Sequence, residues 1–171
     1  MKTETYERLK ALYSKYGPRE FGKLCQKFLA IAFQKAGYSC VAESERGVQG
    51  VDIGEVEKGD EKYSIEVKTT VTNYINYEKK DEEGLRYKKE KGYQPILAVL
   101  QLNRFSDWFF AKADELRAGS LYIDSLRIHR MRELEKVISP YFDETIKQHY
   151  ERALQEGQSY LDNVLRQKIT K

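Results

Sequence analysis

Two carboxylates and one lysine stand at spacings that suit chemistry on a phosphate group. The segment Ile65-Glu66-Val67-Lys68 has the alternation of a β-strand, so Glu66 and Lys68 project to one face and the two apolar residues to the other. Asp52 lies between two apolar residues in a second such segment, although aspartate is depleted in strands. A turn signal, Lys58-Gly59-Asp60, separates the two segments and predicts a hairpin that places Asp52 beside Glu66 and Lys68.

Two carboxylates that converge on one point repel each other unless a positive charge lies between them. A divalent cation meets that need, and hard oxygen ligands favour Mg²⁺, with Mn²⁺ as its substitute. Such an ion polarises a phosphodiester and lowers the pKa of its bound water, while a neighbouring lysine orients the water or stabilises charge on the phosphate. The pattern favours phosphodiester hydrolysis, although a Glu-x-Lys strand taken alone is most often a solvated face with a cross-strand ion pair.

The elements that must position these residues follow from periodicity in the rest of the chain. Apolar residues recur at helical spacing over the first 36 residues, and Gly17-Pro18 divides them into a helix over 1–16 and a second helix that begins at Pro18. Period-two alternation and apolar runs predict strands at 38–43, 51–56, 62–70, 95–102, 107–112 and 121–128. The polar segment 73–93 is expected to be a helical crossover, and 114–117 a single helical turn.

The C-terminal part of the chain is expected to be helical. Helix resumes from Arg130, and a long helix follows Pro140, with Gly157 either kinking it or allowing another segment to approach closely. The order α-α-β-β-β-α-β-β-β-α-α predicts an α/β fold in which helices flank a central mixed β-sheet. With 171 residues the chain has the size of one domain, and we expect a core over about 17–128 and a helical extension over 129–171.

Composition excludes several classes of protein. The 30 basic and 27 acidic residues leave a net charge of +3, which argues against a histone-like polycation and against an acidic tail protein. No apolar run is long enough to span a bilayer, and the first ten residues lack the apolar stretch of a signal peptide, so we expect an intracellular, cytoplasmic protein with no membrane partner. Neither the two cysteines nor the two histidines stand at a metal-ligand spacing.

The motifs together resemble a known superfamily. Gly50-Val51-Asp52-Ile53, a turn and then Glu66-Val67-Lys68 resemble the PD-(D/E)XK nucleases, which include many restriction endonucleases and archaeal Holliday junction resolvases. The segment from Arg46 to Asp52 is similar to the Asp motif of Mrr-type enzymes, and Gly17 to Phe21 matches the helix start that brings a further acid, Glu20. The resemblance covers residues 17–112, and it departs from the family name at Val51, where that name has proline, a position loosely kept in the resolvase and Mrr branches.

The resemblance implies a restriction endonuclease-like core and a Mg²⁺-dependent DNA endonuclease. It implies Asp52 and Glu66 as metal ligands, Lys68 as the catalytic lysine and Glu20 as an auxiliary ligand, either directly or through water. From the residues alone, Glu20 is also explained as a first-turn acid favoured by the helix dipole. Two alternatives stay open: a catalytically silent nucleic-acid-binding or assembly subunit with the same fold, and a nuclease for RNA or single strands.

Oligomeric state follows from the same reasoning. Cleavage of two strands with one active site per chain favours a homodimer, and so does the resemblance. The apolar stripe of the C-terminal helix either folds onto the sheet or pairs with the second copy.

Basic and hydroxyl residues near the motifs are candidates for contact with DNA. Arg46 and Gln49 lie in a glycine-bounded loop that leads into Asp52, where arginine and backbone can approach a phosphate closely. Lys79 and Lys80 belong to the tyrosine- and lysine-rich crossover, which is either a solvated charged helix or a segment that contacts the phosphate backbone. Thr70 shares the face of Lys68, and it is either a phosphate contact or simply a good strand former.

Overall fold

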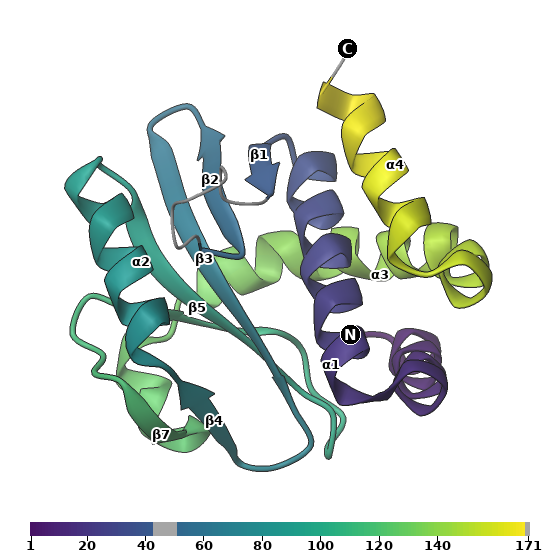
Figure 1. Cartoon of the computed structure of the whole chain (residues 1–171), viewed down its shortest axis with the longest axis horizontal. Helices are drawn as coiled ribbons and strands as arrows, with labels where there is room; N and C mark the ends of the chain where they lie inside the picture. Colours follow the sequence, from purple (N-terminus) through teal and green to yellow (C-terminus); the bar gives the residue numbers. More distant parts are fainter. Residues whose placement is uncertain (43–50, 170–171) are drawn as a thin grey trace.

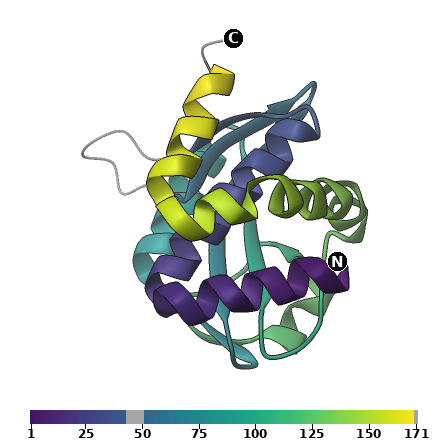
Figure 2. The same ribbon diagram turned by 90° about the vertical axis from the view of Figure 1, so that its right-hand side faces the viewer.

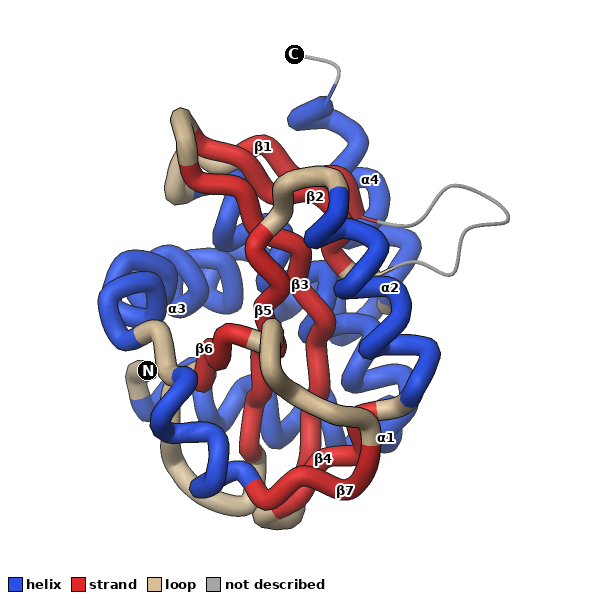
Figure 3. The backbone as a smooth tube through the Cα atoms, turned by 90° about the vertical axis from the view of Figure 1, so that its left-hand side faces the viewer, coloured by secondary structure: helices blue, strands red, loops and turns tan. Residues whose placement is uncertain are grey.

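The computed structural model describes residues 1–42 and 51–169, and a five-stranded mixed sheet forms its centre (Figure 1). The strands stand in the order β1 (Ser39–Ala42), β2 (Ile53–Lys58), β3 (Glu61–Thr70), β5 (Gln94–Gln101) and β6 (Phe109–Lys112). β3 and β5 are parallel, and the other neighbours are antiparallel. A separate two-stranded sheet joins β4 (Tyr74–Tyr77) to β7 (Gly119–Tyr122), and Figure 3 shows it at the end of β3 and β5.

Helices cover both faces of the central sheet. They are α1 (Thr3–Lys35), α2 (Lys79–Glu90), the 3₁₀-helix η1 (Ile123–His129), α3 (Arg132–Glu156) and α4 (Gln158–Ile169). α1, α3 and α4 share one hydrophobic core with the sheet, whereas α2 and η1 share the second core on the other face. The predicted α/β fold with a mixed, helix-flanked sheet is confirmed. No helix in the described ranges is long and apolar enough to cross a membrane.

Strand alternation assigns β3 side chains to the two cores. Ile65 and Val67 pack into the core shared with α1, so Glu66 and Lys68 project to the face that α2 covers. Next to β3, β5 is buried on both faces, as its continuous apolar sequence predicts. The motif therefore lies on a central strand between two layers of helix.

A sharp change of direction divides α1 into two arms (Figure 2). Gly17 adopts φ 79° and ψ 172°, a conformation that glycine tolerates, and Pro18 begins the second arm. The two helices predicted from Gly17-Pro18 are confirmed. The corner is fixed against α3, because the Tyr16 hydroxyl donates to the carbonyls of Ala153 and Leu154 at 3.1 and 2.7 Å.

The polar crossover was predicted wrongly in its first part. Residues 74–77 form β4 before α2 begins at Lys79. Ile75 and Tyr77 are buried and alternate with exposed residues, and the strand pairs with β7, more than forty residues later in the chain. A partner so distant leaves little trace in local sequence, whereas the surrounding lysines and glutamates are typical of helix.

Three further boundaries differ from the prediction. The strand expected at 121–128 is wrong, because β7 ends at Tyr122 and η1 follows, placing Ile123 and Leu126 three residues apart on one buried side. Residues 114–117 contain a turn rather than a helical turn. The helix expected after Pro140 is present, but it does not begin there, since α3 already runs through that exposed proline; Gly157, with φ 69°, separates α3 from α4.

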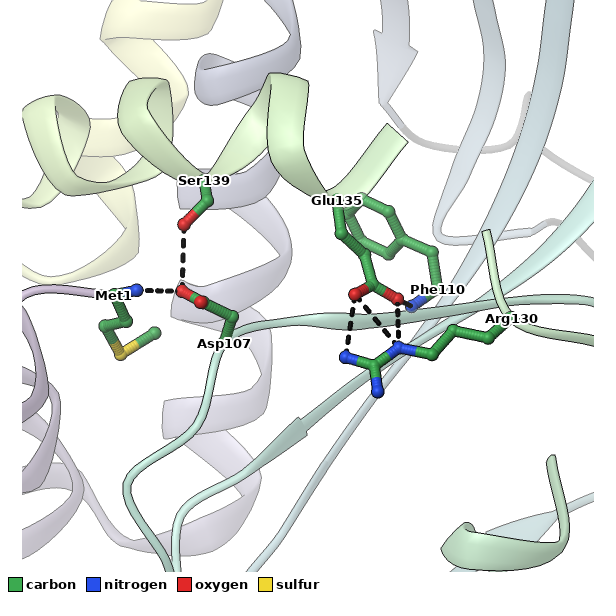
Figure 4. A network of polar contacts seen from close by, with 6 residues as sticks. All are labelled: Met1, Asp107, Phe110, Arg130, Glu135 and Ser139. Atoms are coloured by element: carbon green, nitrogen blue, oxygen red, sulfur yellow. Dashed lines mark hydrogen bonds and ion pairs between the residues drawn. The ribbon is translucent and has the colours of Figure 1, made fainter. Parts of the chain in front are cut away.

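Buried polar contacts tie α3 to β6 (Figure 4). The Glu135 carboxylate accepts the Phe110 N–H at 3.1 Å and the Arg130 guanidinium at 2.8 Å. Next to this group, Asp107 accepts hydrogen bonds from Ser139 and from the amino group of Met1. The single tryptophan, Trp108, is buried alongside, with its ring edge-on to Phe142 and 5.5 Å away between centroids.

Candidate active site

Asp52 lies immediately before β2, which begins at Ile53. The sequence pattern predicts Asp52 inside this strand. Its carboxylate accepts the N–H of Val67 on β3 at 2.9 Å, and its carbonyl accepts the side-chain amide of Gln26 on α1 at 2.9 Å. The pairing of β2 with β3 shifts register between Ile53 and Val56, next to the end that carries Asp52. The Asp52 carboxyl group also shares a hydrogen bond with that of Glu66, so the predicted neighbours meet.

Burial disfavours the charged forms of this pair of carboxyl groups. Glu66 is only 5% exposed; burial first, and then the Asp52 carboxylate, raise the pKa of Glu66 to about 10. Burial is also the main cause that raises the pKa of Asp52. Glu66 Oε2 has no hydrogen-bond partner among the described residues. A proton or a cation must therefore stand between the two groups.

The pair fits a hard divalent cation as a partial set of ligands. Two carboxylates, with one buried and unpartnered oxygen, offer the oxygen donors that Mg²⁺ prefers. Within residues 1–42 and 51–169, no group of three or more His, Cys, Asp or Glu side chains is arranged to hold a metal ion. Water and substrate phosphate would complete the coordination, which is the usual arrangement for Mg²⁺ at phosphates.

Lys68 is held by a carboxylate that the sequence analysis missed. The Lys68 ammonium lies 2.7 Å from Asp81 Oδ2 on α2 and 3.9 Å from Glu66 Oε1. Asp81 is buried, and it also accepts the N–H of Glu78, forming a capping box at the start of α2. The pattern Glu78-x-x-Asp81 before a helix could have identified the cap, but not the contact with Lys68.

Glu20 forms its hydrogen bond away from Asp52, Glu66 and Lys68. It accepts the side-chain amide of Gln158, the first residue of α4. It belongs to α1, which packs on the Ile65 and Val67 face of the sheet, opposite to the face that carries Glu66 and Lys68. The structure brings Asp52, Glu66 and Lys68 together, whereas Glu20 joins α1 to α4.

The residues predicted to contact nucleic acid have different surroundings. The Thr70 hydroxyl donates to the carbonyl of Tyr74 at 3.0 Å and accepts the N–H of Thr72 at 3.1 Å, so it stabilises the turn after β3. Lys79 is exposed, and Lys80 pairs with Glu78 at 3.1 Å. Arg46 and Gln49 lie outside the described residues.

Glu66→Gln is expected to stabilise the metal-free protein increasingly as pH rises. The folded-state pKa of Glu66 lies above the unfolded-state value near 4.5, so its contribution to stability is complete below that value and is lost as pH rises toward about 10. Glutamine cannot ionise, and at about 1.4 kcal/mol per pH unit the gain in free energy of unfolding is of the order of 3–4 kcal/mol at pH 7. Urea unfolding in EDTA at pH 5, 7 and 9 measures it.

Mg²⁺ supplies the matched control for this experiment. The ion should stabilise the wild-type protein and leave Glu66→Gln nearly unchanged, because the variant loses one of the two anionic ligands. A difference in stability between variant and wild type that stays constant from pH 5 to pH 9 in EDTA would contradict the shifted pKa.

Comparison with known proteins supports the fold independently of the motif. No protein-family model matches the sequence, and a search of curated proteins returns no match. Among solved structures, the chain is similar to the Holliday junction resolvase Hjc of the archaeal hyperthermophile Archaeoglobus fulgidus. The TM-score is 0.51 at 18% sequence identity, and the alignment covers 63% of this chain and 89% of the resolvase. The chain thus has the fold of an archaeal Holliday junction resolvase, the PD-(D/E)XK nuclease fold that its motifs resemble.

Proposed function

We propose that this protein is a Mg²⁺-dependent endonuclease that hydrolyses phosphodiester bonds in DNA, as a resolvase or a restriction enzyme of the Mrr type does. The observation that carries the proposal is the convergence of Asp52, Glu66 and Lys68 on one face of the sheet, with the two carboxyl groups in contact and the Lys68 ammonium 3.9 Å from Glu66. The similarity to Hjc supports DNA as the substrate.

Each residue of the group has a distinct task in this proposal. Asp52 and Glu66 would hold the Mg²⁺, which when bound supplies a Lewis acid for the phosphate and acidifies water; Mn²⁺ would substitute. Lys68 donates to the attacking water or to a phosphate oxygen and offsets the charge that develops there. The Val67 N–H and the Gln26 amide keep Asp52 in place, so that its carboxylate stays next to Glu66.

The remaining assignments extend this scheme. Glu20 would act as an auxiliary ligand through water, which requires release from Gln158. DNA would contact Arg46, Gln49, Thr70, Lys79 and Lys80 through its phosphates. A homodimer would place two sites on two strands.

A cleavage panel tests the function. Purified protein is incubated with plasmid, methylated plasmid, a four-way junction, single-stranded DNA and RNA, each with Mg²⁺, Mn²⁺ or EDTA. We expect cleavage of a DNA substrate with Mg²⁺ and with Mn²⁺, and none in EDTA. Cleavage of RNA or single strands alone would favour the alternative substrate class.

The ion pair between Lys68 and Asp81 is the observation that favours the silent-subunit alternative, because it occupies the lysine. Binding of DNA without cleavage under every metal condition, and without Mg²⁺ affinity at Asp52, would establish that alternative.

Asp81→Asn is expected to lower the cleavage rate by about ten- to a hundredfold, because Lys68 loses the carboxylate that holds its ammonium in position. Asparagine retains an oxygen that can accept the Glu78 N–H, so the helix cap is kept. Single-turnover rates of Asp81→Asn, Lys68→Ala and the double variant give a mutant cycle. The double variant should cleave no more slowly than Lys68→Ala, since Asp81 acts through Lys68.

Two results would contradict that role. If Asp81→Asn raised the rate, Asp81 would restrain Lys68 rather than position it. If the two substitutions were additive, Asp81 would act independently of Lys68. Glu83→Gln, on the exposed side of the same helix, is the matched control and should keep the wild-type rate.

A further inference from the structure

The outward face of the β4–β7 sheet carries an exposed pair of tyrosines. Tyr74 and Tyr122 are directly paired across the two strands, and their ring centroids lie 5.2 Å apart. Their exposed fractions are 53% and 42%, so both rings are open to solvent. Asn76 and Ser120, the next outward pair, are exposed too, whereas Ile75 and Leu121 point inward. The outward face therefore presents two aromatic rings next to two polar side chains.

Hydrogen bonds fix this face to the end of the strand that carries Glu66 and Lys68. The Thr70 and Thr72 hydroxyls both donate to the carbonyl of Tyr74 at 3.0 Å, and the Ile123 N–H donates to the carbonyl of Asn73 at 2.9 Å. The turn between β3 and β4 is therefore held on both sides. Figure 3 shows β4 and β7 lying near the end of β3.

The separation of the tyrosines from the candidate active site matches a short stretch of nucleic acid. β3 rises about 3.3 Å per residue, so Thr70 lies about 7 Å beyond Lys68, and Tyr74 is one hydrogen bond from Thr70. The tyrosine pair is thus on the order of 10 Å from the site, the length of about three steps at 3.4 Å per nucleotide of one strand.

Two arginines lie beside this face and outnumber the carboxylate that they share. Arg104 and Arg127 lie 3.7 and 3.5 Å from Asp124, so two cations share one carboxylate. Asp124 also accepts the Tyr122 hydroxyl at 3.3 Å, which connects the arginines to the aromatic pair. Both arginine side chains are more than half exposed, and an excess positive charge beside exposed rings is complementary to a phosphate next to a base.

We propose that the outward face of β4 and β7, formed by Tyr74 and Tyr122 with Arg104 and Arg127 beside them, stacks unpaired bases of a DNA substrate a few nucleotides from the scissile phosphate. This inference rests on the proposed function. Every base has a π-face that an aromatic ring can stack on, whereas the bases inside an intact duplex offer none. The substrate is thus DNA in which paired and unpaired segments meet, with the duplex at the metal site and unpaired bases on the tyrosines.

The test measures binding separately from cleavage. Lys68→Ala protein in EDTA is titrated into fluorescently labelled DNA, either a continuous duplex or the same duplex with a short single-stranded gap. A 2-aminopurine base in the gap reports stacking through quenching of its fluorescence. We expect Tyr74→Ala/Tyr122→Ala in this background to bind the gapped DNA about tenfold or more weakly and to lose the quenching, with affinity for the duplex within about twofold.

Matched variants keep the test sharp. Tyr74→Phe/Tyr122→Phe should retain both affinity and quenching, because the rings remain. Tyr74→Leu/Tyr122→Leu keeps an apolar side chain without a ring, and it should behave like the alanine variant even if alanine lowers the melting temperature. Tyr87→Ala removes an exposed tyrosine of α2, outside the proposed surface, and should change nothing.

Three results would overturn the inference. Unchanged binding of gapped DNA by the alanine and leucine variants would remove the stacking role. Equal losses on gapped and continuous DNA would make the face a general backbone contact. Dissociation of a dimer in sedimentation, with DNA binding intact, would make it an interface between two copies. Stacking without any metal-dependent cleavage by the wild type would instead remove the proposed function alone.

Discussion

Lys68→Ala and Asp52→Asn are each expected to lower the rate of metal-dependent cleavage by about 10²–10⁴-fold. Lys68 places its ammonium 3.9 Å from Glu66 Oε1. Asp52 shares a hydrogen bond with Glu66 and would supply one of two anionic ligands, so its neutral replacement weakens the metal site. Single-turnover cleavage at saturating protein, measured across a Mg²⁺ titration, separates the two effects. Asp52→Asn should shift the Mg²⁺ dependence to higher concentration, whereas Lys68→Ala should lower the plateau.

Folding and binding controls make this prediction specific. Asparagine at position 52 keeps an oxygen for the Val67 N–H, so the variant should melt near the wild type. Both variants should bind DNA in EDTA with wild-type affinity, within about threefold, because the proposed contacts with the DNA backbone lie elsewhere. Asp60→Asn and Lys136→Ala exchange exposed residues of the same types and should leave the rate unchanged. Wild-type rates in Asp52→Asn or Lys68→Ala would refute the assignment of the site.

Glu135→Ala is expected to be the most destabilising single substitution outside the apolar core, at about 3–5 kcal/mol. Glu135 is buried, and its carboxylate accepts the Phe110 N–H and two nitrogens of Arg130. Removal leaves the buried Phe110 N–H without a partner and the Arg130 guanidinium without its counter-ion. In the wild type, the hydrogen bonds to Glu135 hold the pKa of Arg130 above its usual value. At about 2–4 °C per kcal/mol for a chain of this size, the melting temperature should fall by about 6–20 °C.

A second glutamate on the same helix provides the control. Glu133 pairs with Lys136 at 3.4 Å, but its side chain is 91% exposed, so Glu133→Ala should change the free energy of unfolding by less than about 0.5 kcal/mol. Glu135→Gln should fall between wild type and alanine, because the amide oxygen still accepts the Phe110 N–H. Equal melting temperatures for Glu135→Ala and Glu133→Ala would show that the buried pair contributes nothing net.

The parts of the fold that could be predicted are those that local sequence decides. The kink at Gly17 needs one residue with a positive φ followed by proline, and both are visible in sequence. The faces of Glu66 and Lys68 follow from strand alternation alone. By contrast, β4 and β7 become strands because they pair with each other, and a run of tyrosine, asparagine and glycine carries little local signal for that pairing.

The candidate site also contains residues that local sequence predicts and one that it does not. Asp52, Glu66 and Lys68 come from one hairpin, so a turn and an alternation suffice to bring them together. Asp81 comes from α2, and its contact with Lys68 depends on how that helix packs across the sheet. Its sequence neighbourhood is a run of charges typical of a solvated helix, and only packing shows that this one acid is buried.

Trp108 gives the molecule an internal fluorophore at one defined layer. It is the only tryptophan, buried between the sheet and α3 with Phe110 and Phe142 around it, and its indole N–H has no hydrogen-bond partner among the described residues. Excitation at a long wavelength, where tyrosine does not absorb, therefore selects this one indole. Because the indole is buried away from water, its emission should be blue-shifted. Its wavelength follows the docking of α3 and not the state of the carboxylate pair, which lies on the opposite face of the sheet.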